Sequence, residues 1–371
     1  MDMYYKNTPD NHIKRSLTTD ILTESDALKY HQSLPGYQPT PLHKLNNLAR
    51  QYGVGSIYMK DEAHRFGLKA FKALGASYAI YRILQQDEQV DTFCTATDGN
   101  HGRAVAWSAA MAGKNAVVFV PEHTTSARIK AIEKEGATVT RVKGNYDVAC
   151  EIADETSQKK GWKLVQDTCF ENYEEIPAYI VSGYMTMFRE LEDELHPPGK
   201  PEVDIVFLQV GVGSFAASGI WYYLNRYGSK RPKIVLVEPY EADGVLHSLQ
   251  AGKRSTPDKS FDTIMAGLNC GLPSMSAWEM IRSGADVVMS IKDELAAKAM
   301  RMLYHPACKD PQIIAGESGA AGLAGFINLM ESNEHAHLSD FLNINSGSRI
   351  LFVNTEGATD PQNFHDITSS K

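Results

Sequence analysis

From residue 92 onward, short apolar runs rich in β-forming residues alternate with glycine-containing loops and amphipathic segments. This alternation predicts strands joined by helices, the pattern of parallel α/β sheets. The first group of strands would form one small sheet. Its strands are predicted at 92–97, 116–120, 138–142 and 163–165, with helices at about 102–111, 126–135 and 146–159.

A second group of apolar runs predicts a larger sheet. A long amphipathic helix at 176–195 comes first, and the strands follow at 203–210, 233–237, 286–291 and 349–353. The earlier run at 56–60 also needs a pairing partner, and we assign it to this larger sheet. The smaller sheet is then an insertion, so we predict a large domain of residues 1–84 and 176–371 and a small domain of residues 85–175.

Composition narrows the function classes. Of the 371 residues, 43% are hydrophobic and 22% are charged, and the formal net charge is -8. The chain shows no basic field for nucleic acid, no membrane-spanning run and no apolar leader, so we expect a small-molecule partner. The 5 cysteines are widely spread without metal-ligand spacing. We therefore expect a cytoplasmic protein with reduced thiols and no metal, which contacts neither nucleic acid nor a membrane.

The stretch 65–75 (Arg-Phe-Gly-Leu-Lys-Ala-Phe-Lys-Ala-Leu-Gly) contains the candidate catalytic amine, Lys72. Phe71 and a run of small residues flank it, and such surroundings can desolvate an ammonium and favour the nucleophilic free amine. A lysine of this kind forms Schiff bases. Lys69 lies three positions earlier and on a helix would share part of the same face, so spacing alone does not choose between them. Two solvated helix lysines are the simpler alternative.

Two loops combine a strand end with a helix start, where free backbone N–H groups can bind an anion. Residues 98–102 (Asp-Gly-Asn-His-Gly) suggest a carboxylate or phosphate pocket, although a plain capped turn would use the same residue types. Residues 211–216 (Gly-Val-Gly-Ser-Phe-Ala) can cradle a phosphate, with the Ser214 hydroxyl in support. They also satisfy G-x-G-x-x-A, and Glu238 closes the next strand, so a nicotinamide cofactor is an alternative. That alternative would leave Lys72 and the first loop without a role.

Two further segments carry weaker signals. Residues 316–322 (Gly-Glu-Ser-Gly-Ala-Ala-Gly) open a helix rich in alanine and glycine, which permits close approach of backbone to a ligand or to a sheet. The strand at 349–353 runs into Asn354, Thr355 and Glu356, so it ends on a hydroxyl. A buried threonine commonly bonds only to backbone, so this position alone decides little.

Taken in order, these motifs resemble the fold type II pyridoxal-phosphate enzymes, the group of tryptophan synthase β and threonine dehydratase. Within that group the chain is most similar to the diaminopropionate ammonia-lyases. The similar stretches are 60–62, 65–68, 97–103, 106–107, 165–168, 264–268 and 316–320. The resemblance implies pyridoxal 5′-phosphate as cofactor, a homodimer, and two αβα domains with parallel sheets and the cofactor in the cleft between them.

The resemblance also implies roles for individual residues. Lys72 would form the Schiff base, the Ser214 loop would bind the phosphate, and Thr355 would face the pyridine nitrogen, leaving it unprotonated. The implied catalytic residues are Lys72, Asp98 and Asp167. The implied cofactor-binding residues are Lys72, Phe71, Asn100, Gly211, Val212, Gly213, Ser214 and Thr355. The implied substrate-binding residues are Asp98, Gly99, His101, Asp167, Glu317 and Ser318, of which His101 and Glu317 would orient neighbouring groups.

Asp98 and Asp167 point to the substrate. Dehydratases of this group carry a small or hydroxyl residue where Asp98 stands, whereas acidic side chains fit 2,3-diaminopropionate with its two ammonium groups. The resemblance implies α,β-elimination of both isomers to pyruvate and ammonia, with Asp98 serving mainly the D form and Asp167 mainly the L form. Burial that raises the pKa of these carboxyls would help them to capture a proton near neutrality. A serine, threonine or hydroxyaspartate dehydratase is the alternative.

Overall fold

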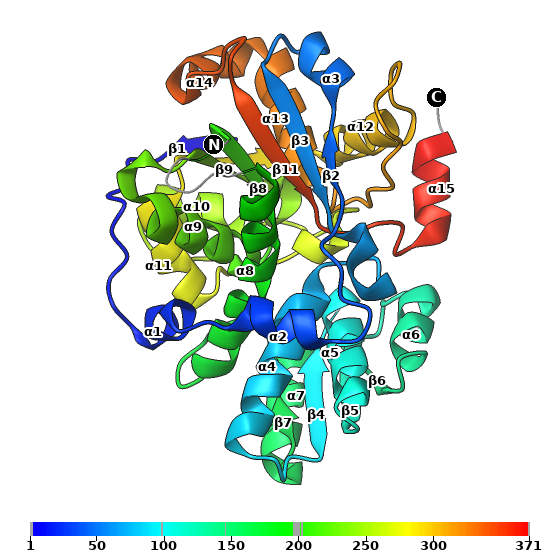
Figure 1. Cartoon of the computed structure of the whole chain (residues 1–371). Coiled ribbons are helices and arrows are strands. Elements are labelled where there is room, and N and C mark those ends of the chain that lie inside the picture. Colours follow the sequence, from blue (N-terminus) through cyan, green and yellow to red (C-terminus); the bar gives the residue numbers. More distant parts are fainter. Residues whose placement is uncertain (1–2, 98, 145, 196–200, 202, 370–371) are drawn as a thin grey trace. The chain divides into compact units, whose positions relative to one another are not determined.

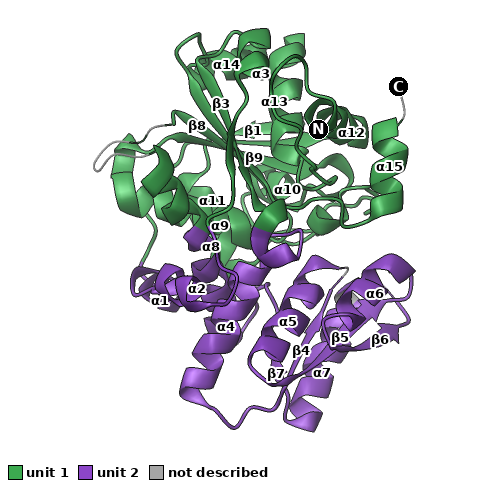
Figure 2. Cartoon of the chain, turned by 45° about the vertical axis from the view of Figure 1, so that its right-hand side comes forward, with its two compact units in different colours: residues 1–14, 39–64, 187–371 green, residues 15–38, 65–186 purple. Residues whose placement is uncertain are grey.

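The computed structural model describes residues 3–97, 99–144, 146–195, 201 and 203–369 (Figure 1). Contacts within the chain separate two compact units, which Figure 2 shows in two colours. Unit 1 comprises Met1–Lys14, Pro39–His64 and Met187–Lys371, and unit 2 comprises Arg15–Gln38 and Arg65–Thr186. Two elements, α8 (Glu175–Leu195) and the 3-10 turn η1 (Glu62–Gly67), contribute residues to both units. Among the described residues, no helix has the length and apolar character needed to cross a bilayer.

Unit 1 is built on a mixed sheet in the order β1-β10-β9-β8-β11-β3-β2. The inner strands from β10 to β3 run parallel, while β1 and β2 pair antiparallel at the two edges. The strands are β1 (Tyr4–Lys6), β2 (Leu42–Lys44), β3 (Ser56–Asp61), β8 (Ile205–Gln209), β9 (Lys233–Pro239), β10 (Val287–Ile291) and β11 (Arg349–Asn354). Because the inner strands are parallel, their carboxyl ends at Gln209, Asn354 and Asp61 all point to the same end of the sheet.

The helices of unit 1 follow the strands along the chain. The α-helices are α3 (Asn46–Gln51), α9 (Ser214–Tyr227), α10 (Gly244–Ala251), α11 (Met275–Gly284), α12 (Asp293–Tyr304), α13 (Ala321–Glu331), α14 (Ala336–Leu342) and α15 (Pro361–Ser369). The 3-10 turns are η2 (Gly228–Lys230), η3 (Tyr240–Ala242), η4 (Ala266–Leu268) and η5 (Asn333–His335).

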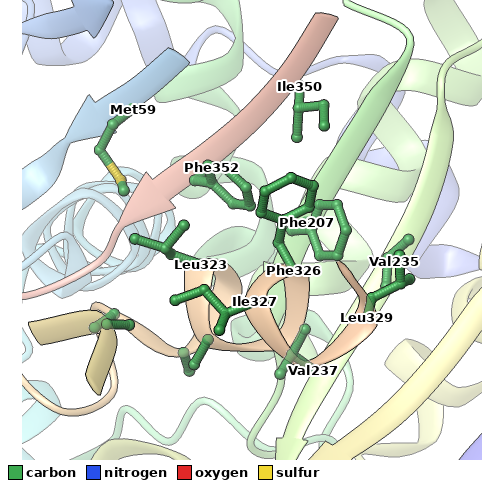
Figure 3. Packing of buried hydrophobic residues seen from close by; sticks show 14 of the residues in the cluster. Met59, Phe207, Val235, Val237, Leu323, Phe326, Ile327, Leu329, Ile350 and Phe352 are labelled. Atoms are coloured by element: carbon green, nitrogen blue, oxygen red, sulfur yellow. The ribbon is translucent and has the colours of Figure 1, made fainter. Parts of the chain in front are cut away.

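The core of unit 1 lies where α13 packs on the inner strands (Figure 3). The ring of Phe326 on α13 lies 5.7 Å from that of Phe207 on β8 and 5.6 Å from that of Phe352 on β11. The other face of β8 is covered too, because a Cβ on Gly219 of α9 would meet Leu208 Cδ1 at 2.7 Å. Strands buried on both faces have continuous apolar sequences, which is why these runs could be predicted.

Unit 2 contains a parallel sheet in the order β6-β5-β4-β7. Its strands are β4 (Thr92–Ala96), β5 (Asn115–Pro121), β6 (Thr138–Val142) and β7 (Lys163–Leu164). Its helices are α1 (Leu17–Thr23), α2 (Ala27–Ser33), α4 (Lys72–Gln86), α5 (Asn100–Met111), α6 (Ser126–Glu133) and α7 (Tyr146–Lys160), with the first part of α8. Helices α5 and α7 cover opposite faces, because Gly102 of α5 lies against Val118 while Ala149 of α7 clusters with Phe119.

The predicted strands form the two sheets to which we assigned them, including the run before Lys72, which is β3 in the larger sheet. Strand β1 was not predicted, because it is short and lies in a polar segment. The compact units have bounds other than the predicted domain ranges, which place 15–38, 65–84 and 176–186 in the large domain. The segment 65–84 groups with unit 2 because α4 packs on α5. The other two segments join it because they contact α4: a Cβ on Gly183 would meet Leu74 O at 2.3 Å, and His31 Nε2 lies 3.0 Å from Leu74 O. The predicted domain ranges stay a prediction.

Candidate active site

Lys72 is the first residue of α4, directly after Phe71. Its ammonium nitrogen lies 5.4 Å from the ring centre of Phe71 and 5.9 Å from that of Tyr184. Tyr184 reaches this position because Gly75 has no side chain: a Cβ there would lie 2.5 Å from Tyr184 Cε1. The two ring centres are 4.6 Å apart, so Lys72 lies beside a pair of aromatic rings at a helix start.

Lys69 does not share this environment. It is exposed, it precedes α4, and its φ of +57° is a left-handed conformation that a helix interior does not allow. The expectation that both lysines share part of one helix face is therefore wrong. The chain turns between them, and only Lys72 is on α4.

Lys72 contacts a buried carboxylate. Its Nζ donates to Asp167 Oδ2 at 2.5 Å, and the two side chains are 18% and 6% exposed. Burial alone would raise the pKa of Asp167, but the positive charge of Lys72 and its hydrogen bond lower that pKa to about 2. The raised pKa that would help Asp167 to capture a proton is therefore not present beside a charged Lys72.

The chain around Asp167 is held by several hydrogen bonds just beyond β7. The side chain of Gln166 accepts from the Ala96 N–H at 3.1 Å and donates to the Ala96 carbonyl at 3.1 Å. The Tyr173 hydroxyl accepts from the Gln166 N–H at 2.8 Å and donates to the Leu164 carbonyl at 3.0 Å. These contacts fix the backbone on the amino side of Asp167 and hence the position of its carboxylate.

His101, on α5, supports the same segment. Its Nε2 lies 2.8 Å from the Val165 carbonyl and must carry the proton, because a carbonyl can only accept. Burial lowers the pKa of His101 and so favours the neutral ring. Its Nδ1 then has no proton to donate to Asp167 Oδ2, which is 3.9 Å away. This geometry supports an orienting role for His101.

The remaining predicted residues of this loop are placed only in part. Asp98 lies outside the described residues. Gly99 precedes α5, its N–H donates to Thr97 Oγ1 at 3.0 Å, and Asn100 is the first residue of the helix. Gly102 is needed for packing, since a Cβ there would lie 2.3 Å from Thr97 Cγ2.

The glycine loop of unit 1 joins the end of β8 to the start of α9. Gly213 has a φ of +101°, and a Cβ there would lie 2.9 Å from Ala277 Cβ, so both conformation and space require glycine. Gly211 lies against the backbone of Gly267, and the Val212 carbonyl accepts from the Ser274 N–H at 2.9 Å. Ser214 is the first residue of α9, so the loop leads into the amino end of that helix, a favourable place for an anion.

Thr355 follows β11 and is buried. Its Oγ1 accepts a hydrogen bond of 2.8 Å from Nε2 of Gln209, the last residue of β8. Sequence reasoning did not single out Gln209. A polar residue that ends an otherwise apolar strand, two positions before Gly211, is a signal that could have identified it.

The predicted substrate residues Glu317 and Ser318 are buried and bonded to neighbours. Glu317 Oε1 accepts from Asn363 Nδ2 on α15. Ser318 Oγ accepts from the Gly267 N–H at 3.1 Å, and the Ser318 N–H donates to Glu356 Oε1 at 3.2 Å. The two segments that include Ser318 and Gly267, both similar to the ammonia-lyases, therefore meet in unit 1.

Glu238 does not have the position of a ribose-binding acid. It is fully buried, and its two carboxylate oxygens accept from the N–H groups of Val245 and Leu246 at 2.9 and 2.8 Å. Its carboxylate caps the start of α10, so this contact gives no support to the nicotinamide alternative. In the part of the chain that is described, no cluster of His, Cys, Asp and Glu side chains is arranged to hold a metal.

The chain has a lysine paired with a buried carboxylate, and it has a glycine loop before a helix on an α/β sheet. These features are typical of the class of enzymes that bind a phosphorylated carbonyl cofactor. The model of the family "Pyridoxal-phosphate dependent enzyme" matches residues 34–355, and the chain belongs to this family. The predicted fold type II and the cofactor pyridoxal 5′-phosphate are confirmed.

The chain is 39% identical over 366 residues to the diaminopropionate ammonia-lyase of Salmonella typhimurium, covering 92% of this chain and 91% of that protein. It is also similar to crystal structures of the Escherichia coli diaminopropionate ammonia-lyase. The complex with an aminoacrylate-PLP azomethine reaction intermediate matches with a TM-score of 0.90 at 35% identity, covering 98% and 96% of the two chains. The complex with D-serine matches with a TM-score of 0.89 at 34% identity and the same coverage.

The residues present fit the cofactor. Lys72 offers a primary amine beside a pair of aromatic rings. The backbone from Gly211 to Gly213, directly before α9, suits a phosphate. Thr355 offers a buried neutral hydroxyl, which can bond a pyridine nitrogen without giving it a full proton.

Proposed function

We propose that this protein is a diaminopropionate ammonia-lyase that converts both isomers of 2,3-diaminopropionate and one water to pyruvate and two ammonia. The observation that carries the proposal is the contact of 2.5 Å between Lys72 Nζ and Asp167 Oδ2. It places a group that can accept a proton beside the amine that we assign to the cofactor. The similarity to ammonia-lyases from Salmonella typhimurium and Escherichia coli supports this choice of substrate.

The roles of the chain's residues follow from their chemistry. Lys72 holds the cofactor covalently, the loop from Gly211 to Ser214 binds its phosphate, and Thr355 bonds its ring nitrogen. When bound, pyridoxal 5′-phosphate withdraws electrons and so stabilises the negative charge left when the α-proton departs. The β-amine then leaves with the bonding electron pair and takes up the proton that the base removed from the α-carbon, which gives the first ammonia. Water then adds to the unsaturated fragment that remains, which gives pyruvate and the second ammonia.

Asp167 has two states that suit this task. Beside a charged Lys72 its pKa is about 2, so the carboxylate is ionised and holds the lysine in place. When Lys72 loses its charge, burial acts without that opposing charge and makes the same carboxylate a stronger base. Asp98 and Asp167 would serve the D and L isomers respectively, while Gly99, Asn100, His101, Glu317 and Ser318 would shape or orient the pocket.

A substrate panel tests the function. The purified holoenzyme is given D- and L-diaminopropionate, D- and L-serine and threonine, and pyruvate, ketobutyrate and ammonia are measured. We expect both diaminopropionate isomers to give the highest kcat/KM, with two ammonia per pyruvate. A higher kcat/KM on serine or threonine would instead identify a dehydratase. Lys72→Ala is the control, because it removes the amine that every one of these reactions needs.

A homodimer and a cytoplasmic location stay predictions made from the sequence. Light scattering coupled to size-exclusion chromatography measures the first, and a mass of one chain would contradict it.

A further inference from the structure

The side-chain amide of Gln209 lies in an unusual environment. Its Nε2 is within 3.4 Å of four oxygen atoms, which are Thr355 Oγ1 at 2.8 Å, Ser318 O at 3.0 Å, Val353 O at 3.0 Å and Gly319 O at 3.4 Å. Three of these are backbone carbonyls, which can only accept. The atom in their midst must therefore be the NH2 nitrogen, and the orientation of the amide is settled.

This orientation decides the direction of the bond to Thr355. An amide nitrogen has no lone pair to accept with, so Gln209 donates and the Thr355 hydroxyl oxygen accepts. The contact with Gln209 is the one hydrogen bond that Thr355 makes to the described residues. Its hydroxyl proton is therefore left for a group that can accept it.

The other end of the amide argues against a purely structural role. Gln209 Oε1 is buried and accepts no hydrogen bond from the described residues. A buried carbonyl without a partner destabilises the folded state, so the oxygen end of this side chain adds nothing to stability. The amide nitrogen is therefore the part of this side chain that makes its contacts.

We propose that Gln209 is a positioning residue that fixes the Thr355 hydroxyl as a hydrogen-bond donor to the pyridine nitrogen of the cofactor. A donor in that place favours an unprotonated ring nitrogen, because a protonated nitrogen would point its own N–H toward the hydroxyl proton and could not accept it. The proposal rests on the role given to Thr355 under the proposed function. It adds that the identity of residue 209 sets the protonation state of the ring.

The test uses the holoenzyme without substrate. The variants are Gln209→Met, which keeps the length but removes the donor, Thr355→Val, which removes the hydroxyl, and the double variant. Gln312→Met is the matched control, because Gln312 also donates to a backbone carbonyl, that of Tyr304 at 2.8 Å, but is exposed. The readouts are the pH midpoint of the visible absorption band of the bound cofactor and the apparent Kd of the cofactor.

We expect Gln209→Met and Thr355→Val to move the pH midpoint in the same direction by roughly half a pH unit or more. Each should raise the Kd about five- to tenfold, the size of one lost hydrogen bond. The double variant should match Thr355→Val alone, because Gln209 acts through Thr355. Gln312→Met should leave both quantities unchanged.

If Gln209→Met does not fold, Gln209→Glu serves instead. An ionised carboxylate accepts the Thr355 proton, so the spectral change should grow as pH rises. A lower Tm with a native spectrum in the residue 209 variant, or additive shifts in the double variant, would overturn the proposal. An unchanged spectrum in Thr355→Val would overturn it as well. Neither readout uses a substrate, so these results are separate from the pyruvate assay of the proposed function.

Discussion

The surroundings of Lys72 in unit 2 differ in chemistry from those of Thr355 in unit 1. Around Lys72 the partners can carry charge: Asp167 is bonded to it, and His101 lies beyond. Around Thr355 and the loop before Ser214, the contacts are made by an amide, a hydroxyl and the backbone. The first arrangement can move protons, whereas the second can only hold and orient. Changes in the first should therefore act on turnover, and changes in the second on cofactor affinity and spectrum.

The largest effect is expected from Lys72→Ala. Loss of the amine should lower turnover by on the order of 10^4-fold or more and abolish the adduct trapped by borohydride. Lys69→Ala is the matched control and should keep the adduct, because Lys69 is exposed and precedes α4. Peptide mapping of the reduced protein checks the site. A label on Lys69 would show that Lys72 does not form the covalent bond to the cofactor.

The next effect separates the two aspartates. Asp98→Asn should lower kcat/KM for D-diaminopropionate, and Asp167→Asn that for the L isomer, each by about 10²- to 10⁴-fold, because one base cannot easily reach both α-protons. Asparagine keeps the size and polarity of the side chain. Each variant's activity on the other isomer is the internal control. Equal losses on both isomers would mean that the carboxylates bind ammonium groups or shape the pocket.

A substitution in the glycine loop should act on affinity. Gly213→Asp and Gly213→Asn both place a Cβ near Ala277 and both must adopt a φ of +101°, so they share the steric cost. Only aspartate adds a negative charge at the start of α9, where it would repel the phosphate. We expect roughly a tenfold greater loss of cofactor on dialysis for Asp than for Asn. Equal retention would place the phosphate elsewhere.

The smallest effect concerns two buried carboxylates with opposite shifts. Lys72 lowers the pKa of Asp167, whereas burial raises the pKa of Glu238 to about 8. A raised pKa means that folded Glu238 keeps a proton that the unfolded chain has lost. Its contribution to stability is therefore present below about pH 4.5 and lost as pH rises toward 8.

Glu238→Gln should reduce the fall of the free energy of unfolding with rising pH. The part of that fall due to Glu238 is at most about 1.4 kcal/mol per pH unit. Urea unfolding at a series of pH values measures it. Glu241→Gln, three positions later, is the control and should keep the native pH dependence in that range. An unchanged slope in Glu238→Gln would show that other groups set it.

The parts of the fold that the sequence predicts are those with a clear pattern of apolar residues. The inner strands are continuous apolar runs, and β6 has the predicted bounds of 138–142. The edge strand β1 was missed because a partner strand, β10, gives it its structure, and no local pattern announces it. The turn at Phe66 and Lys69 was also missed. Both residues have positive φ although neither is glycine, so the residue types do not indicate a turn.

The candidate site divides in the same way. Lys72 and the glycine loop stand in recognisable motifs, so the sequence identified them. Gln209 and Tyr173 act through contacts with distant segments or with backbone, and a residue type alone does not reveal such contacts. The sequence could not predict the lowered pKa of Asp167, because that shift depends on Lys72, which is 95 positions away in the chain. Electrostatic neighbours can be known only from the fold.

The place of β3 in the sheet has a consequence for biosynthesis. β3 pairs with β2 on one side and with β11 on the other, and Asp61 and Asn354 at their ends are 293 positions apart. While the ribosome makes the intervening chain, one edge of β3 has no strand to pair with and offers free N–H and C=O groups to other chains. We expect the nascent chain to depend on chaperones until β11 is synthesised, and refolding from denaturant to be slow and to aggregate as concentration rises.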